Sequence, residues 1–350
     1  MKFKIEIIPY NLKFKRPAGT SRGVYLEHPV WYVVLKSQTD EKHMGIGECA
    51  PLFDLSCDYD ANYSTTLRRF ADEWEKTGEL DDESLKHFPS ILFGFETALR
   101  HFQNRSLRLW NTAYSRGEKG IPINGLIWMG DFDSMYEQIE TKLKAGFRCI
   151  KLKIGAIDFE QELKLLRHIR RHFSPETIEL RVDANGAFSP TDAPEKLKRL
   201  SEFQLHSIEQ PIKAGQWDEM RKLTETTPIP VALDEELIGI NETEDKIRLL
   251  ETICPQYIIL KPTLHGGLIG AKEWIELANA RNIPWWITSA LESNIGLNAI
   301  AQWCSTFDNP LPQGLGTGSL YTNNIDLPLV IKGDCLWSQI DGQTSVKGIY

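Results

Sequence analysis

The sequence predicts an α/β fold in which a parallel (β/α) barrel follows a smaller α+β unit. From Ile121 onward, short apolar runs typical of strands recur about every 26 residues, with amphipathic, charge-rich stretches such as residues 158–173 between them. Strands that alternate with helices form parallel sheets. Eight such runs fit a closed barrel better than an open sheet, and no dinucleotide-binding glycine pattern follows the first run.

The residues before the barrel are predicted to form the smaller unit. Alternating apolar and polar side chains, and a run rich in β-branched and aromatic residues, indicate strands. Segments rich in Pro, Gly and Ser indicate loops, and apolar residues at helical spacing indicate helices. In chain order we expect strands at 2–9 and 30–37, loops at 15–23 and 47–58, helices at 60–76 and 90–104, and a linker at 110–120.

The barrel strands are expected where the apolar runs lie. The last run is the weakest of them, and the apolar pieces after about residue 320 are expected to return to the N-terminal unit. The eight expected strands are 123–128, 149–155, 178–186, 206–212, 230–237, 257–263, 284–290 and 313–318.

The composition excludes several classes of protein. Of the 350 residues, 48 are acidic and 40 are Lys or Arg, which gives a formal net charge of −8. Such a chain lacks the electrostatic attraction for nucleic acid or an anionic membrane, and no apolar run approaches the roughly 20 residues that span a bilayer. The six cysteines show neither metal-site nor disulfide spacing. We therefore expect a cytoplasmic protein with reduced thiols and a small-molecule partner, and a homo-oligomer is compatible with the sequence.

Ionisable residues stand at the ends of successive barrel strands, where buried parallel strands should be apolar. One such charge is most simply explained as a structural ion pair. Five in register are not, because unpaired buried charge is costly. Since the carboxyl ends of barrel strands form the active-site mouth, we expect these side chains to meet there. They are Lys151 and Lys153, Asp183, Glu209, Asp234 with Glu235, and Lys261.

Three carboxylates on one side of a narrow mouth repel one another unless a cation lies between them. Oxygen ligands alone suit a hard divalent ion, so Asp183, Glu209 and Asp234 predict a Mg²⁺ site, with Mn²⁺ as a substitute. Lys153 and Lys261 would then face each other across the mouth, and the nearby cation would lower the lysine pKa. A metal-bound carboxylate beside such a base is the arrangement for removing the proton α to that carboxylate.

Five short motifs together resemble the enolase superfamily, in the branch of muconate-cycloisomerase-like enzymes, and the resemblance covers nearly the whole chain. It implies a (β/α)7β barrel over residues 121–318. It also implies an α+β capping domain formed by residues 1–115 and about 320–350. The motifs are K-L-K at 151–153, V-D-A-N-G at 182–186, I-E-Q-P at 208–211, D-E at 234–235 and L-K-P at 260–262.

The resemblance also implies roles for the residues at the matching positions. Lys153 would be the base, Lys261 would act from the opposite face of the substrate, and Lys151 would support Lys153 electrostatically. The expected metal ligands are Asp183, Glu209 and Asp234, and the expected polar neighbours of the metal are Asn185, Glu235 and Arg181.

Further segments point to one activity within this branch. The run around Arg181, S-A-L-E-S-N-I-G at 289–296 and G-L-G-T-G-S-L-Y at 314–321 resemble the members that dehydrate 2-succinyl-6-hydroxy-2,4-cyclohexadiene-1-carboxylate in menaquinone biosynthesis. The resemblance implies a Mg²⁺-dependent carbon–oxygen lyase that forms 2-succinylbenzoate by a syn elimination through an enediolate. The expected substrate contacts are Arg22, Ser289, Gly314 and Gly316.

Other activities stay open at this stage. An N-succinylamino-acid racemase, a dipeptide epimerase or a muconate cycloisomerase would share the fold and the base. Dipeptide epimerases carry Asp-x-Asp at the eighth strand to hold an ammonium group, whereas residues 314–318 contain no acid, which disfavours a cationic substrate. A non-catalytic binder of an acidic metabolite would not need the lysine pair. A Schiff-base lyase would leave the three carboxylates without a role.

Overall fold

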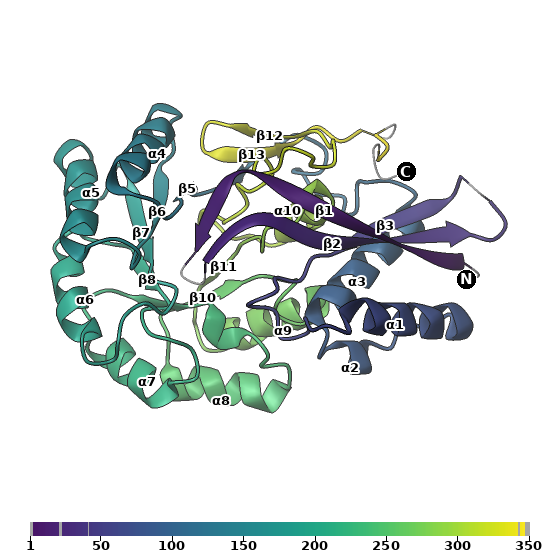
Figure 1. Cartoon of the computed structure of the whole chain (residues 1–350), viewed down its shortest axis with the longest axis horizontal. Helices are drawn as coiled ribbons and strands as arrows, with labels where there is room; N and C mark the ends of the chain where they lie inside the picture. The colour runs from purple at the N-terminus through teal and green to yellow at the C-terminus, as the bar shows by residue number, and fades with distance from the viewer. Residues whose placement is uncertain (1–2, 21–22, 41, 342–343, 347–350) are drawn as a thin grey trace.

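The computed structural model describes residues 3–20, 23–40, 42–341 and 344–346. Figure 1 shows a barrel ringed by helices, with a long antiparallel hairpin and three helices packed against one side of it. Within the described residues, no helix is both long and apolar enough to cross a membrane.

The barrel contains seven hydrogen-bonded strands in sequence order, and every neighbouring pair is parallel. The strands alternate with helices that cover the outside of the sheet (Figure 1). The strands are β5 (Gly125–Ile127), β6 (Cys149–Lys153), β7 (Glu179–Asp183), β8 (Ser207–Glu209), β9 (Val231–Leu233), β10 (Tyr257–Leu260) and β11 (Trp285–Ile287). The helices are α4 (Phe132–Lys144), α5 (Phe159–His172), α6 (Ala193–Ser201), α7 (Trp217–Thr226), α8 (Thr243–Ile253), α9 (Gly267–Asn279) and α10 (Asn294–Cys304), and a 3-10 turn, η1 (Glu235–Leu237), follows β9.

The eighth strand is reduced to two residues that close the barrel. Gln313 forms a parallel bridge to Ile123 beside β5, and Gly314 forms one to Thr288 at the end of β11. The Gln313 amide donates to Pro122 and the Gly314 amide to Ile287, each at 2.8 Å. The predicted (β/α)7β architecture is therefore confirmed.

The N-terminal unit is a three-stranded antiparallel sheet packed on helices. Its elements are β1 (Phe3–Thr20), β2 (Gly23–Ser37), β3 (Met44–Cys49), α1 (Tyr63–Thr77), α2 (Asp82–Leu85) and α3 (Pro89–Asn104). Two predicted loops are partly wrong here. The strand β1 runs through most of the Pro/Gly-rich segment at 15–23, because β2 pairs with it up to Thr20 after an irregularity between Lys13 and Ala18.

The strand β3 begins before the predicted loop at 47–58 and includes its first three residues. The sequence pattern did not predict β3 because the strand contains glycines, and glycine is depleted from strands. These glycines are needed where the strand lies against α3. A Cβ at Gly45 would lie 2.3 Å from the Ala98 carbonyl oxygen, and one at Gly47 would lie 1.9 Å from that of Gly94. Only a strand without side chains at these two positions can approach the helix so closely.

The C-terminal tail contacts both parts of the molecule. Tyr321, Ile325 and Leu327 join a hydrophobic cluster with side chains of β1 and β2. The chain then forms the hairpin β12 (Leu329–Lys332) and β13 (Cys335–Ser338), which pairs with β4 (Ile121–Pro122) just before the first barrel strand. The domain division at residues 115–121 and about 320 stays a prediction.

Two carboxylates of the N-terminal unit reach the ends of barrel helices. Glu96 of α3 accepts hydrogen bonds from the Leu268 and Ile269 amides at the start of α9, at 2.6 and 3.0 Å. Glu48 of β3 accepts from the Ser293 and Gly296 amides at the start of α10, both at 2.8 Å. Helix N-termini carry unpaired N–H groups and a partial positive charge, so each carboxylate joins the two parts.

Candidate active site

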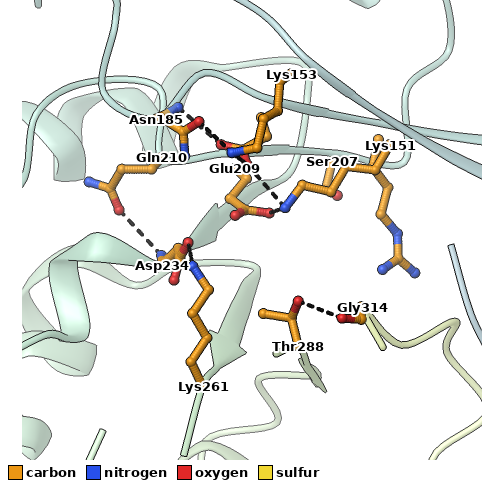
Figure 2. A network of polar contacts seen from close by, with 12 residues as sticks. Lys151, Lys153, Asn185, Ser207, Glu209, Gln210, Asp234, Lys261, Thr288 and Gly314 are labelled. Atoms are coloured by element: carbon orange, nitrogen blue, oxygen red, sulfur yellow. Dashed lines mark hydrogen bonds and ion pairs between the residues drawn. The ribbon is translucent and has the colours of Figure 1, made fainter. Parts of the chain in front are cut away.

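The ends of the barrel strands bring the predicted carboxylates together. Asp183 and Glu209 are the last residues of β7 and β8, and Asp234 follows β9 directly. Their exposed fractions are 1%, 2% and 0%. Lys153 ends β6 and Lys261 follows β10, and Figure 2 shows the two lysines reaching toward the carboxylates from opposite sides.

Three lysines bond to these carboxylates. The Lys151 ammonium lies 3.1 Å from an Asp183 oxygen and 2.5 Å from a Glu209 oxygen. The Lys153 ammonium lies 3.3 Å from the same Asp183 oxygen, and Lys261 pairs with Asp234. Each of the three carboxyl groups therefore has a lysine ammonium within bonding distance.

Asn185 links the base position to the next strand end. Its side-chain oxygen accepts from Lys153 at 2.8 Å, and its amide nitrogen donates to Glu235 at 3.0 Å. The Asn185 backbone is left-handed, with φ of 44°, and its own amide donates to Asp183 at 3.0 Å. This turn directs the side chain back toward Lys153, whereas the sequence predicted Asn185 only as a polar neighbour of the metal.

Charges within the cluster decide the direction of the pKa shifts. Burial works to raise the pKa of Asp183, but Lys151, Lys153 and Lys261 outweigh it and lower that pKa. Burial and the Asp183 charge together raise the pKa of Glu209. Burial works to lower the pKa of Lys261, but Asp234 and other carboxylates raise it. The protein groups alone therefore raise the pKa of Lys261, whereas a neighbouring divalent cation is expected to lower it.

The cluster has the donor chemistry of a site for a hard divalent cation. One oxygen of Glu209 and one of Asp234 are buried and accept no hydrogen bond from the described residues. Carboxylate oxygens are the ligands that Mg²⁺ prefers. No three acidic, His or Cys side chains of the described residues are placed to hold a metal as they stand, because the lysine ammonium groups bond to the carboxylates.

The sequence interpretation missed Gln210, which joins two of the carboxylate positions. Its side-chain oxygen accepts from the Asp234 and Glu236 amides at 3.3 and 3.2 Å, and its amide nitrogen donates to Ile212 and the Glu236 carboxylate at 3.0 and 2.9 Å. Figure 2 shows it reaching the backbone of Asp234. The sequence contains Gln210 in I-E-Q-P and an acidic run at 234–236, but it does not show that these two segments are in contact.

Comparison with known proteins identifies the family. Residues 134–336 match the family described as "Enolase C-terminal domain-like". The chain is 48% identical, over 93% of its length and 96% of the relative's, to an o-succinylbenzoate synthase of Desulfotalea psychrophila. The chain belongs to the enolase superfamily. The crystal structure of MenC from the same organism matches with a TM-score of 0.81 and 43% identity, over 96% of this chain and all of that one.

More distant enolase-superfamily structures share the fold. The substrate-liganded L-Ala-D/L-Glu epimerase of Bacillus subtilis superimposes with a TM-score of 0.85 at 18% identity, over 99% of both chains. At this identity the likeness shows the barrel and the capping sheet alone. Enzymes of this superfamily use Mg²⁺, which agrees with the carboxylate cluster.

The remaining predicted residues of this superfamily member fall into two groups. Ser289, Gly314 and Gly316 line a cavity of about 290 Å³ that also contains the lysines and carboxylates. Arg181 instead lies deeper in the barrel, where it donates to Glu179 and to the Pro312 carbonyl and touches none of the three carboxylates. Arg22, an expected substrate contact, lies outside the described residues.

Proposed function

We propose that this chain is an o-succinylbenzoate synthase, a hydro-lyase that forms 2-succinylbenzoate from 2-succinyl-6-hydroxy-2,4-cyclohexadiene-1-carboxylate. The observation that carries the proposal is the 48% identity to a protein of that name across 93% of this chain. The geometry supports it, because two lysines on opposite sides of a carboxylate cluster suit proton removal next to a bound carboxylate.

Asp183, Glu209 and Asp234 would hold a divalent cation, most simply Mg²⁺, with Mn²⁺ as a substitute. When bound, the ion supplies a positive charge that stabilises the enediolate formed from the substrate carboxylate. The unpartnered oxygens of Glu209 and Asp234 and the burial of all three groups support this assignment.

Lys153 is the proposed base. It removes the proton α to the ring carboxylate and then protonates the hydroxyl that leaves from the same face, which makes the elimination syn. Its ammonium lies 3.3 Å from an Asp183 oxygen and 2.8 Å from the side-chain oxygen of Asn185, and these two contacts hold it at the edge of the carboxylate cluster. The product is aromatic, so the first proton transfer is the difficult step.

Lys261 acts from the other face, where its charge stabilises the enediolate and lies over the ring. Lys151 bonds to Asp183 and Glu209 and adds positive charge beside the base. Asn185 orients Lys153, and Glu235 in turn holds Asn185 through a 3.0 Å hydrogen bond.

Ser289, Gly314, Gly316 and Thr317 are the proposed contacts of the succinyl arm. They line the cavity and carry no acid, which suits an anionic arm and disfavours the ammonium group of a dipeptide. The Ser289 hydroxyl already bonds to that of Thr317 at 2.6 Å, so these two groups form one polar surface.

The same lysine pair would serve racemisation of N-succinylamino acids. Such a substrate also offers an α-proton and a succinyl arm, so the active-site residues alone do not separate it from dehydration. The measurement that separates them is the product formed.

The test is conversion of the cyclohexadiene carboxylate followed by absorbance, with the product identified by NMR. Wild-type protein with Mg²⁺ should form 2-succinylbenzoate, and chelation of the metal should stop the reaction. The same preparation is incubated with N-succinylamino acids and dipeptides in deuterated water. Exchange of their α-protons without dehydration of the cyclohexadiene would contradict the proposal and would indicate a racemase or an epimerase.

We also propose that the protein works in the cytoplasm. All six cysteines are free, three of them buried, which is the usual state of thiols in a reducing compartment.

A further inference from the structure

One side of the cavity is lined by residues that have no role in the proposed reaction. Asn124, Leu126 and Trp128 alternate along the first barrel strand and line the cavity from inside the barrel. Gln138 and Lys142 of α4 also line it, although that helix lies outside the strands.

The barrel wall is open at this place. On one side, β5 pairs with β6 through three residues. On its other side, the contact with the last strand is the bridge between Ile123 and Gln313, together with the Asn124 amide, which donates to Gln313 at 3.0 Å. Within the described residues no bridge joins β5 itself to the chain after Gln313. Side chains of α4 can therefore reach the cavity between β5 and residues 314–317.

The position of Lys142 in this opening is fixed by the helix. Gln138, one turn earlier on the same face, accepts from the Trp128 amide at 2.9 Å and donates to the Trp128 carbonyl at 3.3 Å. Lys142 follows on that face, and its ammonium lies 4.8 Å from the ring centre of Phe147. The side chain is half-buried, and burial lowers its pKa.

Lys142 differs from the other lysines of the cavity. Four lysines line it in the part of the chain that the structure describes. Lys151, Lys153 and Lys261 are paired with carboxylates of the cluster. No ion pair among the described residues involves Lys142, so it is the cation left to meet an anion from outside the protein.

Asn124 lies in the same opening. The residue is 6% exposed, and its backbone amide is bonded to Gln313. Its side-chain amide makes no hydrogen bond to any described residue, yet it lines the cavity. The amide is therefore open to the cavity, and an oxygen of a ligand that enters the cavity can accept a hydrogen bond from it.

We propose that Lys142 and Asn124 form a subsite for the second, terminal carboxylate of the substrate. The inference rests on the proposed function, since it takes the ring carboxylate to the metal site and the succinyl arm along β5. It assigns recognition of the terminal carboxylate to one cation and one amide, while Ser289 and Thr317 line the same cavity along the rest of the arm. A substrate whose arm ends in an uncharged group would lose this contact.

The experiment compares two ligands that differ only at the end of the arm. 2-Succinylbenzoate ends in a carboxylate, and 2-butanoylbenzoate ends in a methyl group at the same place. Binding of each is measured by calorimetry in the presence of Mg²⁺. Hydrogen bonds to charged groups make ten- to hundredfold differences, so Lys142→Met should weaken binding of 2-succinylbenzoate by about that factor and leave 2-butanoylbenzoate unchanged.

Two variants serve as controls. Lys142→Arg keeps the charge and should retain most of the preference for the succinyl arm. Lys144→Met removes an exposed lysine of the same helix and should change neither affinity. Asn124→Ala should reduce the same preference by a smaller factor.

The inference is overturned if Lys142→Met weakens both ligands equally, if it weakens neither, or if wild type does not distinguish them. Failure of the proposed function would look different. Wild-type protein would then not dehydrate the cyclohexadiene, while its preference for the charged arm and the dependence of that preference on Lys142 would persist.

Discussion

The two walls of the cavity are built differently. On the wall formed by β6 to β10, every catalytic side chain is already bonded to another: lysines to carboxylates, Asn185 to Lys153, and Gln210 to the backbone beside Asp234. On the wall formed by β5, α4 and residues 314–317, the strands separate. Among the described residues, the side chain of Asn124 makes no hydrogen bond and that of Lys142 makes no ion pair.

We infer from this difference that one wall serves catalysis and the other serves recognition of the substrate arm. Catalysis requires groups held in place before the substrate arrives, because reorganising dipoles during the reaction costs rate. Recognition of a charged arm requires the opposite, since groups already satisfied by the protein gain little from a ligand. Substitutions on the first wall should therefore affect turnover and metal binding. Substitutions on the second wall should affect the affinity for the succinyl arm and the packing of the wall itself.

The largest effect should come from Lys153→Met on the first wall. It removes the proposed base while keeping the length of the side chain, and general bases contribute about 10²- to 10⁴-fold. The rate of dehydration at saturating substrate should fall by that factor, with 2-succinylbenzoate still bound. Lys164→Met, on the exposed surface of α5, is the control. A rate within a few-fold of wild type would remove Lys153 from the mechanism.

A smaller effect on the same wall is expected from Gln210→Leu. The leucine has similar size but cannot hold the Asp234 and Glu236 amides, so the carboxylates should lose their relative placement. Partners of metal ligands typically contribute about 10- to 100-fold in metal affinity. Titration calorimetry with Mg²⁺ should show this loss.

The control for the Gln210 variant is Gln161→Leu, which removes an exposed amide of α5. Unchanged Mg²⁺ affinity together with a loss of thermal stability would mean that Gln210 is structural only, and the first wall would then depend less on preorganisation than we infer.

The smallest effect is a difference in stability between alanine substitutions at two glycines of the second wall. A Cβ at Gly314 would lie 2.1 Å from the Thr288 hydroxyl, whereas at Gly316 the nearest atom is 3.5 Å away. Gly314→Ala should lower the free energy of unfolding by about 1–3 kcal/mol, as overpacking does, and Gly316→Ala should leave it nearly unchanged. Urea denaturation measures both. Equal losses would mean that this wall is as tightly filled as the first.

Much of the fold could be predicted because the pattern is local. Apolar runs at a regular interval and charged residues at their ends identify the barrel without any knowledge of contacts. The strand β3 was missed in part because Gly45 and Gly47 are explained only by the helix they touch. Likewise the eighth strand is too short for a pattern, since Gln313 and Gly314 are defined by their two neighbours.

The same limit applies to the site. Asp183, Glu209, Asp234 and the lysines were predictable because each stands out as a charge at the end of an apolar strand. Lys142 and Asn124 do not stand out, because a lysine in an amphipathic helix and an asparagine near a strand are ordinary in sequence. Their position on one opening depends on where the barrel wall separates, which only the structure shows.

The contacts of Glu48 and Glu96 with the starts of α10 and α9 have a consequence for how the molecule moves and melts. A rigid-body swing of the N-terminal unit about a hinge would strip both carboxylates from their amide donors, at a cost of about 1–3 kcal/mol for each group left unsatisfied. Substrate should therefore enter by local motion of loops. Because these two buried carboxyl groups find their amide donors only across the boundary between the units, the whole chain should unfold cooperatively, as a single calorimetric transition.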